Sequence, residues 1–353
     1  MHTTVENYIM RIRRIKMIKV AINGFGRIGR LVFRLMEESN DFEVVAINDL
    51  TDAEQLAYLL KYDTNHRNYR IDEITNEEDA IIVGTRKIKV YAELDPKNLP
   101  WKELDVDVVM ECTGKFTDKE KAHAHIEAGA KKVVISAPAK GDLKTIVYNV
   151  NEKDLTGEEE IISAASCTTN CLAPVLNVIH TAFGIEKGYM TTVHAYTNDQ
   201  ATLDVPHKKG IRARRGRAAA ANIIPASTGA ASAIGKVLKD LDGRLDGTAM
   251  RVPVATGSVI DLVLELNKNV ESEQINQVLK ENANETLGYT EDPIVSSDII
   301  GSHFGGLVDG LSTSVLEVNG RQLVKVVAWY DNVMSYTAQM VRTAKYLCDI
   351  SKK

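Results

Sequence analysis

Short apolar runs alternate with helical stretches through the first half of the chain. Residues 30–38 and 117–128 carry apolar side chains at helical spacing. The other runs are short and continuous, as in strands buried on both faces, and they cover 18–23, 43–48, 106–110 and 132–135. Strands that alternate with helices in this way predict an α/β fold with a parallel, doubly wound sheet.

The pattern changes in the second half, where helical stretches become fewer. Apolar and polar side chains alternate there as in half-buried strands, over 189–196, 258–266, 314–318 and 323–330. We expect an α+β unit with a mixed or antiparallel sheet. A final amphipathic stretch, 335–349, predicts a helix that returns to pack on the first sheet.

A glycine-rich turn, G-F-G-R-I-G, directly follows the first predicted strand and opens the first predicted helix. This is the context in which G-x-G-x-x-G binds a dinucleotide. Gly24 allows the tight turn, Gly26 lets the backbone approach a pyrophosphate, and Gly29 lets the helix pack against the strand. Arg27 and Ile28, the residues between them, are predicted to contact the cofactor too. The pyrophosphate would lie at the helix N-terminus.

An acidic residue, Asp49, ends the second predicted strand, twenty residues beyond Gly29. Its carboxylate can accept hydrogen bonds from a ribose 2′-hydroxyl and would repel a 2′-phosphate, which favours NAD over NADP. Ser136 falls at the carboxyl end of another strand, where ligands dock in such sheets. Glycines alone also suit an ordinary turn, but the strand, helix and acid in register predict an NAD-binding, Rossmann-type domain.

These patterns divide the chain. We expect a disordered extension over residues 1–16, an NAD-binding domain over 17–166 and a catalytic domain over 167–333. The helix over 334–353 is expected to return to the first domain.

The run A-S-C-T-T-N-C places Cys167 between a strand-like segment and a helical one. Ser166 is suited to cap that helix, and the amides and dipole of its first turn stabilise a thiolate over a thiol. Cys167 is therefore a candidate nucleophile. An inert buried thiol and a metal clip formed with Cys171 compete with this interpretation. Structural zinc sites need four ligands, and since no other paired cluster occurs in the sequence we expect no metal.

A histidine in a predicted strand, His194, is the candidate partner of Cys167. A histidine in such a strand is usually structural. A cysteine–histidine pair, however, forms a thiolate–imidazolium nucleophile whose imidazole can also move protons.

Composition limits the remaining function classes. The 353 residues are 44% hydrophobic and 26% charged, with a formal net charge of −5. An acidic balance argues against nucleic-acid or membrane binding driven by bulk charge. No apolar run reaches the ~18 residues that span a bilayer. The sequence has only 4 cysteines, which suggests a reducing compartment, and the cytoplasm is the expected location.

The first 16 residues are basic toward their end and are followed by a second methionine, Met17. They lack the long apolar core and small-residue cleavage site of a targeting peptide. We therefore favour an upstream start or a disordered extension over a targeting signal.

Several motifs together resemble the glyceraldehyde-3-phosphate dehydrogenase family, in its phosphorylating, NAD-dependent form. They occur in the family's order from about Met17 onward: N-G-F-G-R-I-G-R, A-S-C-T-T-N-C, H-A-Y-T, R-V-P and W-Y-D-N. The resemblance implies a glycolytic enzyme that converts glyceraldehyde 3-phosphate, NAD and inorganic phosphate into 1,3-bisphosphoglycerate. Family members are usually homotetramers.

The resemblance also implies roles for individual residues. Cys167 would attack the aldehyde to give a thiohemiacetal and then a thioester, with His194 moving the proton. Asn332 would bind the nicotinamide carboxamide. Two anion sites are needed: one for the substrate's own phosphate and one for the attacking phosphate. Thr197 and Arg251 would form the first, and the second would comprise Ser166, Thr168, Thr228 and Gly229, with Arg215 nearby.

An arginine cluster, Arg212, Arg214, Arg215 and Arg217, has several interpretations. Such a run is usually a solvated face and can also suggest nucleic acid. In the family this stretch is a loop at a subunit interface beside the cofactor, and given the acidic net charge we favour that interpretation.

Two substitutions depart from the family pattern. Leu94 stands where an arginine near the adenine is typical, and Val333 follows Asn332 where an acidic residue is usual. Both bear on cofactor binding and leave the Cys167–His194 pair intact. A related dehydrogenase acting on erythrose 4-phosphate, and a non-catalytic binding role on the same scaffold, are the alternative functions.

Overall fold

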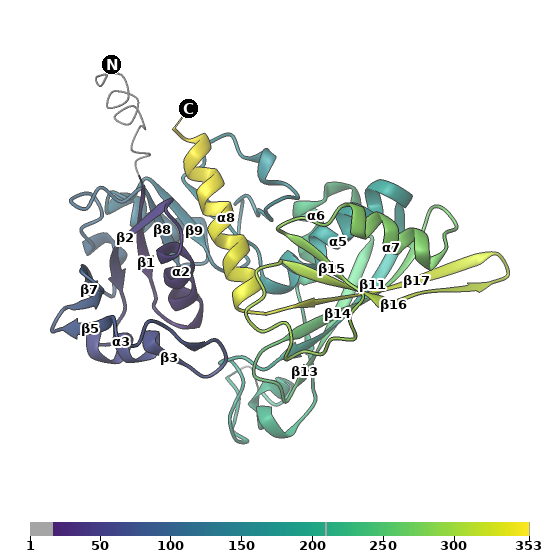
Figure 1. Ribbon diagram of the computed structural model, residues 1–353, viewed down its shortest axis with the longest axis horizontal. Coiled ribbons are helices and arrows are strands. Elements are labelled where there is room, and N and C mark those ends of the chain that lie inside the picture. The colour runs from purple at the N-terminus through teal and green to yellow at the C-terminus, as the bar shows by residue number, and fades with distance from the viewer. Residues whose placement is uncertain (1–16, 209, 353) are drawn as a thin grey trace, which may run out of the picture.

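Two β-sheets lie side by side in the computed structural model, with the C-terminal helix between them (Figure 1). The structure describes residues 17–208 and 210–352. The extension predicted for residues 1–16 lies outside these residues.

The first sheet has the strand order β10-β9-β8-β1-β2-β7-β6-β5. Strands from β10 to β7 are parallel, and β6 and β5 are antiparallel at one edge. Both faces of its centre are covered, so that Val20, Ala21 and Ile22 are fully buried. Its strands are β1 (Ile18–Asn23), β2 (Phe42–Asn48), β5 (Ile74–Glu77), β6 (Ala80–Val83), β7 (Arg86–Tyr91), β8 (Val108–Glu111), β9 (Lys132–Ile135) and β10 (Ile161–Ser163).

Three helices and a small hairpin accompany this sheet. The helices are α2 (Arg27–Glu37), α3 (Ala53–Lys61) and α4 (Lys119–Glu127). The hairpin pairs β3 (Tyr62–Asp63) with β4 (Arg67–Asn68) and extends toward the second sheet (Figure 1).

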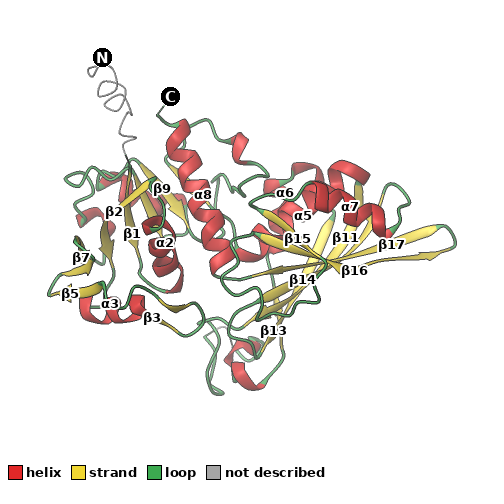
Figure 2. Ribbon diagram, viewed as in Figure 1, coloured by secondary structure: helices red, strands yellow, loops and turns green. Residues whose placement is uncertain are grey.

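The second sheet is mixed, with the order β12-β13-β11-β14-β17-β16-β15. Helices α5 (Cys167–Phe183), α6 (Ala230–Val237) and α7 (Ser272–Glu281) pack on one face (Figure 2) and share an apolar core with it. Its strands are β11 (Ile185–Ala195), β12 (Ile224–Ser227), β13 (Leu245–Val252), β14 (Ser258–Leu266), β15 (Leu287–Thr290), β16 (Gly306–Val318) and β17 (Arg321–Tyr330). Short 3₁₀ helices occupy Pro96–Asn98, Glu152–Asp154, Arg214–Gly216, Ala219–Ala221 and Lys239–Leu241.

The last helix, α8 (Met334–Ile350), follows the second sheet and packs on the first. Tyr336, Met340, Ala344 and Leu347 belong to the same buried core as β1 and α2. This return brings the end of β17 close to the first sheet, where the site described below is built.

The predicted fold class, a doubly wound parallel sheet plus a mixed α+β unit, is confirmed. The sequence pattern missed β13, whose segment L-D-G-T-A-M-R-V has few β-branched residues. This strand is held by pairing with β11 on one side and β12 on the other, so tertiary contacts outweigh its weak local preference.

Candidate active site

The glycine turn between β1 and α2 is tightly packed where two of its glycines lie. Gly24 has φ of +90°, and a Cβ there would lie 2.8 Å from the Thr113 nitrogen. A Cβ at Gly29 would lie 2.1 Å from the Gly24 carbonyl oxygen. A Cβ at Gly26, in contrast, would meet nothing within 4 Å. The turn therefore has no space for a side chain at Gly24 or Gly29, where it packs against the protein. At Gly26 the backbone faces open space, which a ligand can approach.

The start of α2 fits an anionic group. Its N-cap, Gly26, provides no side chain to cap the first amides. Arg27 Nη2 is buried and has no hydrogen-bond partner among the described residues. Unfilled donors at a helix N-terminus are the arrangement that binds a pyrophosphate.

A cavity of about 270 Å³ opens beside this turn, lined by Gly24 and Gly26 of the turn and by Asp49 after the second strand. Asp49 lies at its wall, accepting from Phe25 N at 2.7 Å and from Thr51 N at 3.1 Å. Leu94, the apolar departure, also lines it and is 73% exposed. Acidic and apolar groups at one rim suit the ribose and base of a nucleotide.

Two other predicted cofactor residues lie at the same end of the sheet. Ser136 follows β9, and its amide donates to the Glu111 carbonyl at the end of β8 (2.9 Å). Ile28, in the first turn of α2, packs against the core of the first sheet.

Cys167 is the first residue of α5, as predicted, and Ser166 caps that helix. Ser166 Oγ accepts from the Thr169 amide at 3.2 Å and lies 2.7 Å from Thr169 Oγ1. Ala165, just before the cap, has φ of +60°, a left-handed conformation that costs an alanine about 1–2 kcal/mol. The half-buried Cys167 packs against the cores of both sheets. The thiol therefore lies at the junction of the two sheets.

The structure brings His194, near the end of β11, to Cys167. His194 Nε2 lies 3.5 Å from Cys167 Sγ. Its Nδ1 lies 2.6 Å from the Ala195 carbonyl oxygen, an acceptor, and 3.1 Å from Arg251 Nη1, a donor. The shorter contact favours the tautomer with the proton on Nδ1, in which Nε2 offers a lone pair to the thiol. Arg251 Nη1 donates to the same carbonyl at 3.1 Å.

Burial controls the charge of both groups. Burial raises the pKa of the Cys167 thiol, while the charge of Arg251 and hydrogen bonds from Thr168 oppose the rise. Burial, followed by the charge of Arg251, lowers the pKa of His194 to about 3. The expected lowering of the Cys167 pKa by the helix start is thus outweighed, because the thiol is desolvated. Both groups are therefore neutral at pH 7, so the thiolate–imidazolium pair expected from the sequence is not the resting state: a thiol faces a neutral imidazole.

A hydroxyl network behind the thiol was not foreseen from the sequence. Thr168 Oγ1 lies 2.9 Å from the Tyr330 hydroxyl, which lies 2.8 Å from Thr192 Oγ1. The Tyr330 ring meets the His194 ring edge to face, with centroids 5.8 Å apart. Tyr330 therefore supports both the helix start and the imidazole. Tyr330 belongs to the W-Y-D-N motif, and this motif is the feature of the sequence that could have pointed to it.

Thr197 and Arg251 also lie together beside His194. Arg251 Nη1 donates to Thr197 Oγ1 at 3.0 Å. Asp199, missed in the sequence, accepts from the Thr197 hydroxyl and pairs with Arg215. Two of the predicted phosphate residues, Thr197 and Arg215, thus contact this carboxylate, and Arg251 joins them through Thr197. The other arginines of the cluster, Arg212, Arg214 and Arg217, are exposed.

Thr228 and Gly229 mark the start of α6. Gly229 is its N-cap without a side-chain cap, and Thr228 Oγ1 accepts from the Ala230 amide at 3.2 Å. Helix α6 packs with α5 in the core of the second unit.

Asn332 follows β17 and is 5% exposed. Its amide oxygen accepts from Gly257 N at 3.1 Å, from Ser258 Oγ at 3.2 Å and from Thr256 Oγ1 at 3.3 Å. These contacts fix the amide and direct its NH₂ group away from them. Val333, the second departure, is buried and its amide donates to Asp331.

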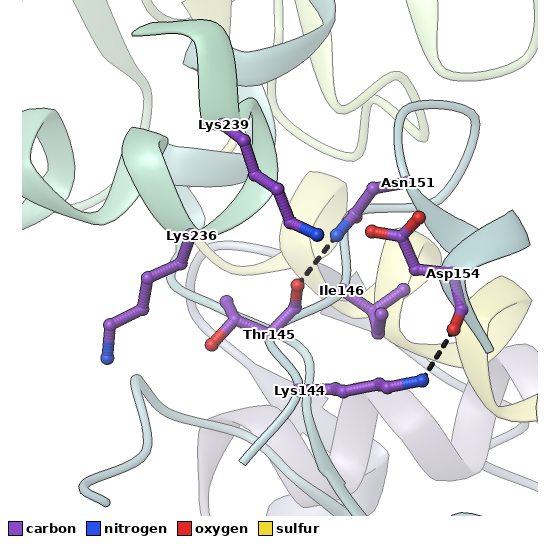
Figure 3. Close-up of a pocket in the computed structure, with 7 residues that line it drawn as sticks. All are labelled: Lys144, Thr145, Ile146, Asn151, Asp154, Lys236 and Lys239. Carbon is purple, nitrogen blue, oxygen red and sulfur yellow. Dashed lines mark hydrogen bonds between the residues drawn. The ribbon is translucent and has the colours of Figure 1, made fainter. Parts of the chain in front are cut away.

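A second cavity, of about 240 Å³, is lined partly by lysines (Figure 3). Lys144 Nζ donates to the Asp154 carbonyl at 2.6 Å and to Glu159 at 2.5 Å. The side chains of Lys236 and Lys239 point in different directions (Figure 3). The amines do not converge, so we assign no ligand to this cavity.

Among the residues described, no group of three or more His, Cys, Asp or Glu side chains is arranged to hold a metal ion. In the described stretches no helix combines the length and apolarity needed to cross a membrane.

A parallel sheet with a dinucleotide turn, joined to a second sheet with a buried cysteine–histidine pair, defines the class of a nucleotide-dependent dehydrogenase with a thiol centre. Family comparison agrees: residues 18–119 match the NAD binding domain of glyceraldehyde 3-phosphate dehydrogenase, and residues 166–332 match its C-terminal domain. The chain belongs to the glyceraldehyde 3-phosphate dehydrogenase family, and its cofactor is NAD.

Curated relatives cover nearly the whole chain. It is 61% identical to glyceraldehyde-3-phosphate dehydrogenase of Clostridium pasteurianum over 336 residues, which are 95% of this chain and 100% of the relative. Identity to the Clostridium acetobutylicum enzyme is 60% over the same shares. The Streptococcus pyogenes enzyme is 56% identical over 95% of this chain and 99% of its own length.

Proposed function

We propose that this chain oxidises glyceraldehyde 3-phosphate with NAD and inorganic phosphate to 1,3-bisphosphoglycerate. The observation that carries the proposal is the 3.5 Å approach of Cys167 Sγ to the proton-accepting Nε2 of His194, at the junction of the two sheets. This pair meets the geometric requirement for an activated thiol nucleophile.

The first step is addition of the thiol to the aldehyde. As the bond between Cys167 Sγ and the carbonyl carbon forms, the thiol proton passes to His194 Nε2 and from there to the carbonyl oxygen, giving a thiohemiacetal. Burial lowers the pKa of His194 and keeps it neutral at pH 7, so its Nε2 lone pair is free to accept this proton as the carbon–sulfur bond forms. The Cys167 amide, at the start of α5, and protonated His194 are placed to stabilise the developing oxyanion.

The second step converts the adduct into an acyl group on sulfur. His194 Nε2 accepts the hydroxyl proton of the thiohemiacetal. When bound, NAD supplies the hydride acceptor for this oxidation. The product is a thioester on Cys167, and an oxygen of inorganic phosphate then forms a bond to the acyl carbon as the carbon–sulfur bond breaks.

The neighbouring residues supply donors for two phosphates. Thr197 and Arg251 lie within hydrogen-bond distance of each other beside His194, which supports a role in holding the substrate phosphate. Arg215 pairs with Asp199, which also accepts a hydrogen bond from the Thr197 hydroxyl. The start of α6, with Thr228 and Gly229, supplies backbone donors suited to the attacking phosphate.

Ser166 and Thr168 are proposed with Thr228 and Gly229, but their hydroxyls already have protein partners. Ser166 Oγ caps α5, and Thr168 Oγ1 contacts Tyr330. Each hydroxyl retains acceptor or donor capacity toward a ligand. Cys167 therefore has proposed phosphate ligands on both sides.

The residues around the first sheet fit NAD. Gly24, Gly26 and Gly29 shape the turn, and the orphaned Nη2 of Arg27 is available for an anion. Asp49 offers carboxylate oxygens at the cavity wall for a ribose. We assign Ile28 and Ser136 to the same site. The fixed amide of Asn332, with its NH₂ group turned outward, is suited to a carboxamide.

We also propose that the protein is a cytoplasmic homotetramer. The face of the second sheet opposite α5, α6 and α7 carries exposed apolar side chains, including the cross-strand pair Tyr189 and Val263 and nearby Leu323. Such a patch favours burial against another copy. All the cysteines are free thiols, which supports a reducing compartment. Light scattering after size-exclusion chromatography measures the assembly.

A spectrophotometric assay of NADH formation tests the proposed reaction. Glyceraldehyde 3-phosphate and erythrose 4-phosphate are compared, each with and without phosphate or arsenate. We expect turnover with glyceraldehyde 3-phosphate that depends on the added anion. Faster turnover of erythrose 4-phosphate would assign the chain to that substrate, and no turnover of either would favour a binding role. Multiple turnover without phosphate would refute phosphorolysis.

A further inference from the structure

We infer that His66 is a positioning residue for Asn332, acting through Asp331. The inference rests on the proposed function, in which Asn332 binds the nicotinamide end of NAD. His66 lies in the turn of the β3–β4 hairpin, and its Nε2 is 2.8 Å from Asp331 Oδ2. The two side chains are 2% and 0% exposed, respectively. This contact joins the β3–β4 hairpin, which accompanies the first sheet, to the residue that directly follows β17.

Asp331 is the centre of the local hydrogen bonding. Its Oδ2 also accepts from Gly301 N at 2.8 Å. Its Oδ1 accepts from Val333 N at 2.8 Å and Met334 N at 2.9 Å, which fixes the entry into α8. A displaced Asp331 would therefore move the backbone on both sides of Asn332.

The hydroxyl of Thr256 lies between the side chains of Asp331 and Asn332. Thr256 Oγ1 lies 3.2 Å from Asp331 Oδ1 and 3.3 Å from Asn332 Oδ1. The Asn332 amide is held by the same loop through Gly257 and Ser258. The position of the carboxylate and the orientation of the amide are thus set together.

On its other side the hairpin is tied to α2, the helix that begins at the glycine turn. Arg34 Nη1 donates to the His66 carbonyl at 3.1 Å. Arg30 Nη2 lies 3.7 Å from Asp63 Oδ2, and His66 Nδ1 lies 3.5 Å from Asp63 Oδ1. A continuous chain of polar contacts therefore runs from the helix proposed to hold the pyrophosphate to the residue proposed to hold the nicotinamide.

The charges alternate along this chain of polar contacts. Burial alone would lower the pKa of His66, but hydrogen bonds and negative charge from Asp331 and Asp63 outweigh it and raise the pKa to about 9. His66 is therefore a cation between two carboxylates at pH 7. Removing one member of a buried pair leaves an uncompensated charge, so Asp331 would be drawn toward other donors or water.

The test compares His66→Ala, His66→Gln and a control, His123→Ala. The His123 side chain lies on α4, is 44% exposed and contacts Glu127, away from the chain of contacts described above. NAD affinity is measured by titration without aldehyde, and KM for NAD, KM for aldehyde and kcat are measured with it. We expect His66→Ala to weaken NAD binding and raise its KM by about tenfold, with the KM for aldehyde changed by less than about twofold. His66→Gln should recover part of the loss because its amide can donate to Asp331. The control should match the wild type.

Two outcomes would overturn the inference. One is a folded His66→Ala variant with unchanged NAD affinity and KM. The other is an equal rise in KM for NAD and for aldehyde that is not smaller in His66→Gln than in His66→Ala. Such a result indicates general destabilisation. If His66→Ala fails to fold, His66→Gln carries the test: it keeps a donor to Asp331 but removes the positive charge, and NAD binding must be weaker than in the wild type. Wild-type protein that binds NAD but forms no NADH would refute the proposed reaction, while the titration would still decide the role of His66.

Discussion

Replacing His66 by glutamine should remove a pH-dependent contribution to stability. In the folded protein the pKa of His66 is raised from 6.5 to about 9, because the carboxylates of Asp331 and Asp63 outweigh the effect of burial. A raised pKa stabilises the fold below the unfolded value and loses this effect as pH rises through the folded value. At about 1.4 kcal/mol per pH unit, the difference corresponds to roughly 3 kcal/mol.

The assay is urea denaturation of wild type and His66→Gln at equal protein concentration, at about pH 6, 7.5 and 9.5. The wild type should exceed the variant in free energy of unfolding by the largest amount at the lowest pH. The excess should shrink as pH rises toward and beyond 9. A constant difference across this range, or one that grows with pH, would refute the charged His66–Asp331 pair.

Three further substitutions test the proposed site. Gly29→Ala should destabilise the protein by about 1–3 kcal/mol and raise the KM for NAD, since its Cβ would lie 2.1 Å from the Gly24 carbonyl; an unchanged KM would contradict the packing of the turn. Asp49→Asn should raise the ratio of kcat/KM for NADP to that for NAD, because the variant no longer repels a 2′-phosphate; no change in the ratio would exclude Asp49 from the ribose site. His194→Asn should lower kcat by roughly 10²- to 10⁴-fold and leave NAD affinity intact; full activity would exclude His194 as the proton acceptor.

The fold and the centre of the site could be predicted because they depend on local patterns. Buried strands, the glycine turn and the helix that begins at Cys167 each have a signature within a short stretch of chain. The structure places these elements where the pattern predicts them. The resemblance to a family then supplied candidate partners that no local pattern could supply.

The parts that could not be predicted depend on distance in the sequence or on burial. His66 and Asp331 are 265 residues apart and meet only because α8 returns to the first sheet. The pKa of Cys167 was expected to fall at a helix start, but the packing of both cores around the thiol raises it. Desolvation belongs to the assembled structure and has no signature in the local sequence.

The most direct test of the central claim is a single-turnover experiment without phosphate, followed by mass spectrometry. Enzyme, NAD and glyceraldehyde 3-phosphate are mixed, and NADH and the modified peptide are measured together. We predict a stoichiometric burst of NADH and an acyl group on Cys167, absent from Cys171 and discharged when phosphate is added. A burst without acylation of Cys167, or an acyl group on another residue, would contradict the covalent role of Cys167.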